Sequence, residues 1–168
     1  MVATPVNREI PAEFRDSLLR ALSGAGAHVG AGKVLDGLDW QRAGARPEGA
    51  PHSAFQIVNH LVFWQDHALA WLAGEKPPTP AHDAESWPGP ERPADAAAWE
   101  AAAARFAAGL DRLRRHAAED DLLAHRGPKS VLYVLQVVAA HDSYHLGQVV
   151  LLRQQLGAWP PPGGGFTW

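Results

Sequence analysis

The sequence predicts an all-α protein that folds as a four-helix bundle. Apolar residues recur at helical spacing in four separate stretches, which is typical of amphipathic helices that pack around a core. The alternation of apolar and polar residues that is typical of strands is absent. A long proline-rich connection separates the second stretch from the third, which favours a bundle with a crossover.

The first helix is expected over residues 11–23, because its apolar stripe is followed at once by Gly24 and Gly26. The stripe consists of Phe14, Leu18, Leu19 and Leu22. A loop rich in glycine and proline is expected over residues 24–52. The residues expected to anchor this loop are Leu35, Leu38 and Trp40.

The second helix is expected to begin after Ser53, whose hydroxyl can cap it while the Gln56 side chain reaches back. Its apolar run covers residues 55–71, and it ends near Gly74. The next connection, residues 75–94, holds six prolines and cannot be helical throughout. About 20 extended residues reach beyond roughly 60 Å, so helices two and three can run parallel.

The third helix is expected to begin after Asp95, which can act as its N-cap, and to end near His116. Its apolar residues are Trp99, Phe106, Leu110 and Leu113. The fourth helix is expected to begin after Ser130 and to end at Gly157, shortly before Pro160.

The composition excludes several classes of protein. A length of 168 residues suits one domain, expected over residues 1–168, and such a chain buries about 70% of its unfolded surface. The formal charge of −3 and the lack of a basic face argue against nucleic acid as a partner. The absence of cysteine excludes disulfides, thiolate ligands and a cysteine nucleophile. No apolar stretch is long enough to span a bilayer and no leader is evident, so we expect a cytoplasmic protein without a membrane partner.

Two histidines, His141 and His145, lie four residues apart in a long apolar run and therefore share one face of the predicted fourth helix. The stripe that contains them is Val131, Val134, Val138, His141, His145, Val149, Leu152 and Leu156. Because this stripe is the inward face of the helix, both imidazoles are expected to point into the core. His60 adds a third inward imidazole from the apolar face of the second helix.

Three inward imidazoles from two helices favour a facial site for one divalent metal ion, with coordination positions left open. The alternative is that His141 and His145 are buried histidines whose nitrogens are satisfied by hydrogen bonds in the core. The cost of burying several imidazoles without partners favours the metal site. Trp64, Tyr144 and Gln148 are the candidates for the wall of the surrounding pocket.

Two other segments look like known motifs but depart from them. Residues 141–145 read H-D-x-x-H, close to the zinc-protease motif H-E-x-x-H, yet no His, Asp or Glu follows His145 as a further ligand. Asp142 is therefore expected to orient a ligand or to pair with a neighbouring helix. Residues 27–33 look like a loose phosphate loop, but Val34 stands where Ser or Thr should bind magnesium.

The C-terminal segment, residues 159–168, is rich in proline, glycine and tryptophan. This composition is too rigid and too aromatic for a flexible, disordered C-terminus. Three roles remain open for it: folding back over the bundle, covering the mouth of the pocket, or forming a subunit contact.

At these motifs the chain resembles the DinB-like superfamily of metalloenzymes, and the resemblance covers nearly the whole chain. The matching segments are LLRALSGAGAH at 18–28, PHSAFQIVNH at 51–60, HDSYHLGQ at 141–148 and LLRQQLGAW at 151–159. The resemblance implies up-down-down-up connectivity, with the proline-rich crossover between helices two and three. It also implies a divalent metal held by His60, His141 and His145, and a homodimer.

Relatives of this kind include thiol-dependent transferases or isomerases, and hydrolases. We therefore expect a metal-dependent enzyme in which zinc, nickel, manganese or iron activates a low-molecular-weight thiol or water, with a small-molecule substrate. Any thiol must come from a small molecule, because the chain has no cysteine. The alternative is a non-catalytic, stress-related helical binding protein with a structural or vestigial metal site. The family name refers to induction by DNA damage and does not imply binding to DNA.

Overall fold

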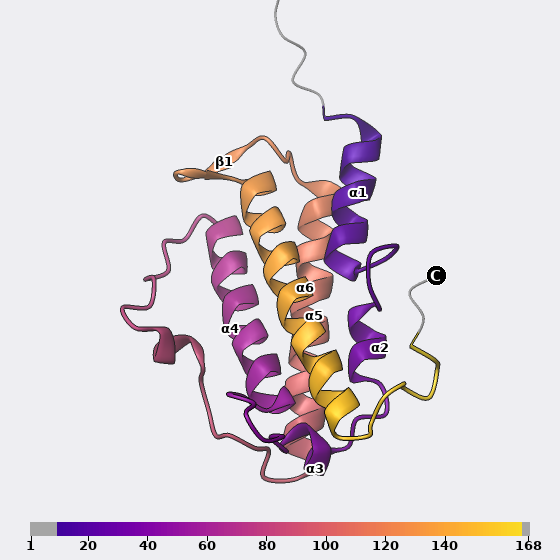
Figure 1. Ribbon diagram of the computed structural model, residues 1–168. Coiled ribbons are helices and arrows are strands. Elements are labelled where there is room, and N and C mark those ends of the chain that lie inside the picture. The colour runs from indigo at the N-terminus through magenta and orange to yellow at the C-terminus, as the bar shows by residue number, and fades with distance from the viewer. Residues whose placement is uncertain (1–9, 166–168) are drawn as a thin grey trace, which may run out of the picture.

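The computed structural model describes residues 10–165 and is mostly helical, as the sequence predicts (Figure 1). The four long helices are α1 (Ala12–Ser23), α4 (Ala54–Leu72), α5 (Ala96–Glu119) and α6 (Val131–Gln155). The shorter elements are α2 (Ala31–Leu35), α3 (Trp40–Ala43), the 3-10 helix η1 (Asp83–Ser86), and the strands β1 (His125–Arg126) and β2 (Lys129–Ser130). The two strands pair antiparallel, and they are the one departure from an all-α fold among the described residues.

The expected caps start the three longest helices. The Ser53 hydroxyl accepts a hydrogen bond from the Gln56 amide, and the Gln56 side chain accepts one from the Ser53 amide, which completes the capping box of α4. Asp95 accepts from the Ala98 amide at the start of α5. Ser130 caps α6 in the same way. These local signals explain why the predicted starting positions are correct.

The long helices pack so that α4 contacts α5 and α6, while α1 contacts the same two helices. The Ser53 hydroxyl, just before α4, donates to the Glu91 carbonyl, just before α5, at 2.6 Å. At the opposite end, the Arg15 guanidinium near the start of α1 donates to the carbonyls of Ala117 and Asp120 at the end of α5. Figure 1 accordingly shows α4 and α5 starting at the end where α3 lies, whereas α1 and α6 start at the end with β1.

The structure corrects or adds detail to the expected elements in three places. The loop of residues 24–52 contains α2 and α3. Asp39 caps the start of α3, because its side chain accepts a hydrogen bond from the Arg42 amide. Of its expected anchors, Leu38 is buried, whereas Leu35 and Trp40 are half-buried. The third long helix continues to Glu119 rather than ending near His116, because Ala117 is fully buried in the core. The connection after α4 contains η1.

The C-terminal segment folds back along the molecule, as far as residue 165. Its anchor is Arg153, which is 1% exposed and donates to the carbonyls of Val34 and Ala158. Its guanidinium lies 5.5 Å from the centre of the Trp159 ring. Burial lowers the pKa of Arg153. The segment therefore packs beside α2, and the expected role of its last three residues lies outside the described part of the chain.

None of the helices in residues 10–165 combines the length and the apolar character that crossing a membrane requires.

Candidate metal centre

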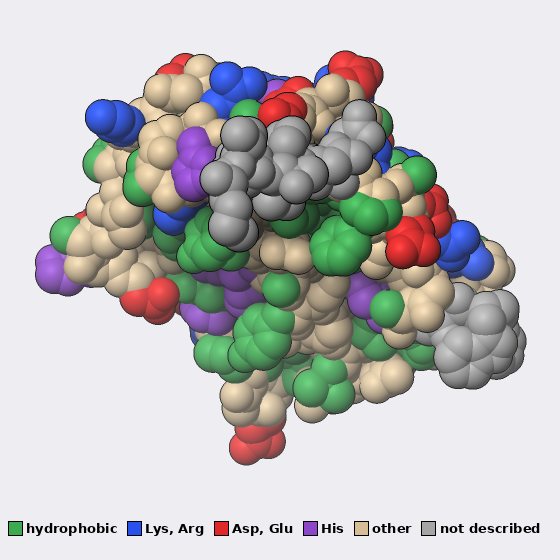
Figure 2. Space-filling model, turned by 90° about the horizontal axis from the view of Figure 1, so that it is seen from above, with side chains coloured by type: hydrophobic (Ala, Val, Ile, Leu, Met, Phe, Trp, Pro, Cys, Tyr) green, Lys and Arg blue, Asp and Glu red, His purple; other side chains and the backbone are tan. Residues whose placement is uncertain are grey.

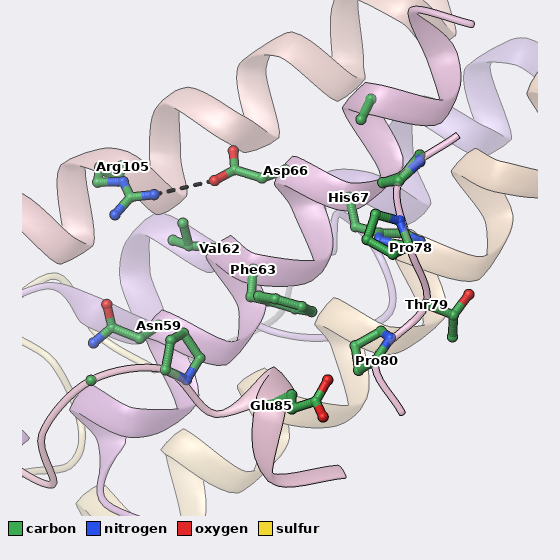
Figure 3. A pocket seen from close by; sticks show the side chains of 14 residues that line it. Asn59, Val62, Phe63, Asp66, His67, Pro78, Thr79, Pro80, Glu85 and Arg105 are labelled. Atoms are coloured by element: carbon green, nitrogen blue, oxygen red, sulfur yellow. Dashed lines mark hydrogen bonds and ion pairs between the residues drawn. The ribbon is translucent and has the colours of Figure 1, made fainter. Parts of the chain in front are cut away.

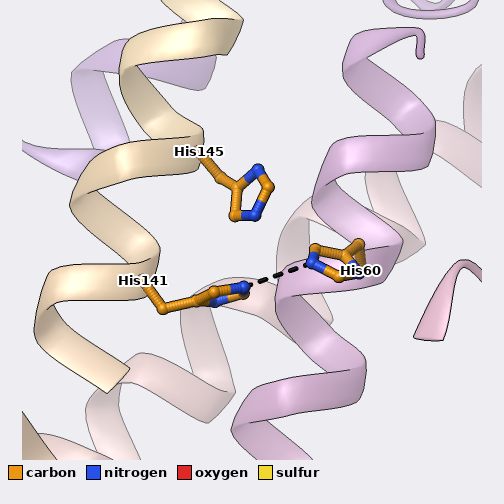
Figure 4. Close-up of side chains that lie close together, drawn as sticks. All are labelled: His60, His141 and His145. Carbon is orange, nitrogen blue, oxygen red and sulfur yellow. Dashed lines mark hydrogen bonds between the residues drawn. The ribbon is translucent and has the colours of Figure 1, made fainter. Parts of the chain in front are cut away.

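Three histidines from two helices come together inside the bundle (Figure 4). His60 lies on α4, and His141 and His145 lie on α6 one turn apart. One nitrogen from each of the three rings lies within 4.8 Å of the others, so the cluster can hold a metal ion. His60 and His145 are 4% and 7% exposed, and His141 is half-buried. The juxtaposition expected from helical spacing is therefore present.

The His60 ring is oriented from outside the bundle by η1. Its Nδ1 lies 2.7 Å from the Ser86 carbonyl oxygen. Because a carbonyl only accepts hydrogen bonds, Nδ1 carries the proton and Nε2 keeps its lone pair. That Nε2 points at His141, so the lone pair faces the centre of the cluster.

The His145 ring is oriented in the same way, from within its own helix. Its Nδ1 lies 2.7 Å from the Gln148 side-chain oxygen, one turn further along α6. This hydrogen bond places the proton on Nδ1 and leaves Nε2 free to bind a ligand. A metal-binding histidine normally donates its other N–H to such an acceptor.

Two polar atoms at His141, its own Nδ1 and the Asp142 Oδ1, have no hydrogen-bond partner unless a cation binds. Its Nε2 lies 3.2 Å from the His60 Nε2, which is an acceptor, so the His141 Nε2 must donate its proton there. The His141 Nδ1 is then a buried lone pair without a partner. Its neighbour at 3.8 Å is the Asp142 Oδ1, which also has no partner. Two facing acceptors in a buried site are costly.

A divalent ion fits this donor set. Two nitrogens that share an ion at about 2.0–2.1 Å lie roughly 3.0–3.4 Å apart, and the two Nε2 atoms of His60 and His141 are 3.2 Å apart. If the His141 Nε2 held the ion, the ring proton would lie on Nδ1, beside the Asp142 carboxylate. Asp142 is buried and accepts from the Gln65 amide on α4 at 2.9 Å, so it pairs with the neighbouring helix as the sequence suggested.

The buried histidines of the cluster stay neutral at pH 7. Burial is the main cause that lowers the pKa of His60, to about 4, and the nearby His145 and His141 lower it further. Burial also lowers the pKa of His145, and this effect exceeds that of the hydrogen bond to Gln148, which raises the pKa. Neutral imidazoles are the form that binds metal ions, so no proton has to leave these two rings at neutral pH.

Two aromatic rings that hold the site, those of Trp87 and His52, could not be assigned to it from the sequence. The Trp87 ring stacks on His60 with centroids 3.9 Å apart, and on its other side it stacks on His52 at 3.6 Å. Burial lowers the pKa of His52. Trp87 follows η1 in the proline-rich connection, where no periodicity indicates which side chain turns inward. A tryptophan among prolines was the one available signal.

A cavity of about 520 Å³ leads to His145. Two of the three expected wall residues line it: Gln148, and Tyr144, whose ring centre is 5.0 Å from that of His145. Trp64 is not among its lining residues; its ring instead lies edge-on against His60 and His141. Part of the remaining wall comes from the segment before α4 and from the connection after it. Those lining residues are Glu48, Gly49, Ala50, Pro51, His52 and Trp87.

A larger cavity, of about 800 Å³, lies between α4 and the connection that follows it (Figure 3). It is lined by none of the three clustered histidines. Of its three charged residues, Asp66 and Arg105 already pair with each other at 3.1 Å, and Glu85 accepts a hydrogen bond from the Ala81 amide. His28 also lies elsewhere: its Nε2 hydrogen-bonds the Ser143 hydroxyl at 2.9 Å, on another side of α6. Neither location brings together a set of groups comparable to the histidine cluster.

The comparisons with known proteins give one match. The model of the family described as the DinB superfamily matches residues 32–149, which is more than half of the chain and includes all three clustered histidines. No curated protein and no solved structure matches the chain significantly.

Proposed function

The chain belongs to the DinB superfamily, and from this premise we propose that it is a metal-dependent enzyme. In this proposal His60, His141 and His145 hold one divalent ion, which is zinc, nickel, manganese or iron. Such an ion lowers the pKa of a small-molecule thiol or of water and so supplies a nucleophile at neutral pH. The reaction is then a thiol-dependent transfer or a hydrolysis.

The observation that carries this proposal is the convergence of three histidine rings beside an open cavity, two of them, His60 and His145, with an unprotonated Nε2. The cluster has three ligating side chains, and no fourth His, Asp or Glu joins it among residues 10–165. A purely structural zinc site is usually closed by four protein ligands, whereas a catalytic site keeps a position for the reactant. The three-residue set therefore favours the enzyme over a binding protein with a structural metal.

The residues of the chain have distinct roles in this proposal. The Ser86 carbonyl and the Gln148 side chain fix which nitrogen of His60 and His145 faces the ion. Trp87 and Tyr144 provide aromatic walls that bind the substrate and exclude water from it. We further propose a single domain over residues 1–168, up-down-down-up connectivity supported by the Ser53–Glu91 hydrogen bond, and a cytoplasmic location, where thiols are kept reduced.

Metal binding is tested first. The protein is loaded separately with each of the four ions and dialysed, and its metal content is measured by elemental analysis. We expect about one ion per chain in the wild type and none in the variant that combines His60→Ala, His141→Ala and His145→Ala. His125→Ala, an exposed histidine in the strand pair, is the control and should keep the ion. Equal metal content in the triple variant would refute the site.

The reaction is tested with the metal-loaded protein. Several low-molecular-weight thiols are each combined with a panel of electrophilic substrates, and ester and amide substrates are tested without thiol. Turnover that requires metal and thiol, and that is lost in His145→Ala, supports the transferase. Turnover that requires metal alone supports the hydrolase. A metal-loaded protein with a fourth protein ligand in its coordination shell, measured by X-ray absorption, would support the structural role instead.

A further inference from the structure

A second pair of chemically complementary side chains lies outside the metal centre, where α6 passes the turn that follows α1. The Ser143 hydroxyl oxygen and the His28 Nε2 are 2.9 Å apart, although the two residues are separated by 115 positions in the sequence. Both residues are half-buried. Two residues along a helix correspond to a rotation of about 200°, so Ser143 points away from the inward face that carries His141 and His145. The pair is therefore separate from the histidine cluster.

The backbone determines which nitrogen of the His28 ring carries the proton. The His28 Nδ1 lies 2.8 Å from the Val29 carbonyl oxygen. Because a carbonyl only accepts hydrogen bonds, Nδ1 carries the proton and Nε2 is the acceptor. The Ser143 hydroxyl therefore donates to Nε2. A hydroxyl that donates to an imidazole, which is itself oriented by a third group, is the arrangement that activates a serine nucleophile.

Gly24, the residue that ends α1, holds the His28 ring in place. Its φ of 78° lies in the left-handed region that favours glycine, and its carbonyl accepts a hydrogen bond from the His28 amide at 3.0 Å. A Cβ atom at Gly24 would overlap the imidazole, so the ring packs directly on the backbone of this turn. The turn therefore gives the base a defined position beside Ser143.

The hydroxyl of Ser143 differs from that of an ordinary helical serine. A serine inside a helix commonly donates to the backbone carbonyl one turn earlier, which satisfies the hydroxyl locally. Ser23 on α1 does this, because it donates to the Leu19 carbonyl at 3.1 Å. Ser143 donates instead to a ring from another segment of the chain. Its oxygen is therefore held beside a base rather than against its own helix.

Ser143 and His28 both line a hollow of about 290 Å³ between α1 and α6. Most of its other lining residues are apolar, and none is Lys, Arg, Asp or Glu; they are Phe14, Ser17, Leu18, Ala21, Ala27, Leu132, Gln136, Ala139 and Ala140. Figure 2 views the molecule from the end where β1 lies and shows histidine side chains that reach the surface between hydrophobic ones. A small, uncharged and apolar hollow suits a neutral ligand with a short acyl chain.

We propose that Ser143 and His28 form a second catalytic site, which hydrolyses small neutral esters and is independent of the metal centre. The Ser143 Oγ attacks the carbonyl carbon of the ester, and its proton passes to the His28 Nε2. The bond between the carbonyl carbon and the alcohol oxygen then breaks, and His28 gives the proton to the leaving alcohol. Water attacks the acylated serine while His28 accepts a proton from that water. This proton returns to the Ser143 Oγ as the carboxylic acid leaves.

The nucleophile is tested by covalent labelling of the full chain in the presence of a chelator. The probe is a small dialkyl fluorophosphate, which loses fluoride when its phosphorus bonds to an activated serine oxygen, and peptide mass spectrometry locates the label. We expect the label on Ser143 of the wild type, and labelling about 10²–10⁴-fold slower in His28→Gln, which lacks the base. Ser23→Ala is the control and should label at the wild-type rate. A wild type that is not labelled at Ser143, or a His28→Gln variant labelled as fast, overturns the proposal.

The reaction is tested by release of nitrophenol from nitrophenyl esters, again with chelator present. Nitrophenyl acetate should be hydrolysed by the wild type and by Ser23→Ala, and about 10²–10⁴-fold more slowly by Ser143→Ala with unchanged helical circular dichroism. Nitrophenyl decanoate should react more slowly than the acetate, because its acyl chain exceeds the hollow. Equal rates in Ser143→Ala and wild type, or a wild-type activity that chelation abolishes, overturn the proposal. An activity lost on chelation would belong to the metal centre, so failure of this site and failure of the proposed function are distinguishable.

Discussion

Each clustered histidine depends on a neighbour that fixes its ring. Ser86 accepts from His60, Gln148 accepts from His145, and Asp142 lies next to His141. Such neighbours decide which nitrogen is available and how the ring is turned, and they commonly change metal affinity by one to two orders of magnitude. The affinity of this site therefore depends on more residues than its three ligands.

Trp87→Ala should weaken metal binding by about 10–100-fold, because it removes the ring that stacks on His60 and loosens the adjacent Ser86 carbonyl. Trp87→Phe keeps a stacking ring and should recover most of the affinity. Calorimetric titration of the metal-free variants measures both values. Trp71→Ala, a half-buried tryptophan near the end of α4, is the control. An equal loss of affinity in this control would point to general loosening of the bundle.

The metal-free protein should lose stability as the pH falls from 6.5 towards 4. Burial holds the pKa of His60 at about 4 in the folded state, whereas in the unfolded chain the imidazole has its ordinary pKa of 6.5. Below pH 6.5 the unfolded state therefore binds a proton that the folded state does not, and the free energy of unfolding decreases. The contribution of His60 between pH 7.5 and pH 5 is about 2 kcal/mol.

Urea denaturation of the metal-free protein at several pH values measures this dependence. His145, His52 and His67 also have lowered pKa values, so their loss of stability has the same sign. His60→Gln should show a shallower decrease below pH 6.5 than the wild type. Unchanged or greater stability of the wild type at pH 5 would contradict the prediction.

The clustering of the three histidines could be predicted from the sequence, whereas the residues around them could not. Helical spacing alone places His141 and His145 on one inward face, and their neighbours in the stripe are buried. Trp87 and Ser86 lie in an irregular segment whose path depends on tertiary contacts, so no local pattern indicates them. His52 likewise lies just before α4 without a local pattern that indicates its stacking on Trp87.

At the scale of the helices, local signals were reliable where side chains cap the backbone. Ser53, Asp95 and Ser130 each satisfy free amides in the first turn, so their helices begin where expected. The short helices α2 and α3 escaped prediction because five and four residues cannot show a helical period. They form in place because residues such as Val34 and Ala43 pack into the core.

The α5 helix contacts the histidine cluster indirectly, because Gly109 lies against the side chain of Gln65. Gly109→Ala should therefore destabilise the protein by about 1–3 kcal/mol, although glycine-to-alanine changes in open helical positions stabilise by up to about 1 kcal/mol. The added methyl group displaces Gln65, which is hydrogen-bonded to Asp142 beside His141. Metal affinity should therefore fall as well.

Gly32→Ala in α2 is the matched control, because a Cβ atom there meets nothing within 4 Å. Denaturant unfolding and metal titration of both variants give the comparison. Should Gly109→Ala gain stability as Gly32→Ala does, the contact between α5 and Gln65 would be too loose to transmit the effect.

For the whole molecule, the apolar core is expected to keep the fold without metal. The core contains large buried residues at both ends of the bundle, such as Leu61 and Val149 at one end and Leu113 and Leu135 at the other. Removing the ion with a chelator should lower the melting temperature by about 5–10 °C, relative to protein with a 100-fold excess of metal over its Kd. The helical circular dichroism at 25 °C should remain.

Thermal scans with and without chelator measure this shift. The triple variant His60→Ala, His141→Ala and His145→Ala should show no shift, which serves as the control. Loss of helical signal on chelation would mean that the metal supplies the free energy of folding, as in small zinc domains.

The clustered histidines lie on two helices, α4 and α6, that are far apart in the sequence, and this separation affects the kinetics of folding. His60 and His141 are 81 residues apart in sequence, and the helix that follows α4 in the chain begins beside its start rather than returning from its end. Early local contacts therefore cannot assemble the cluster, and closing so long a loop is entropically costly and slow. Before this loop closes, His141 and His145 are the only members of the cluster that are close in sequence, and His60 is not yet beside them. Metal added at the start of refolding should thus leave the folding rate nearly unchanged and mainly slow the rate of unfolding.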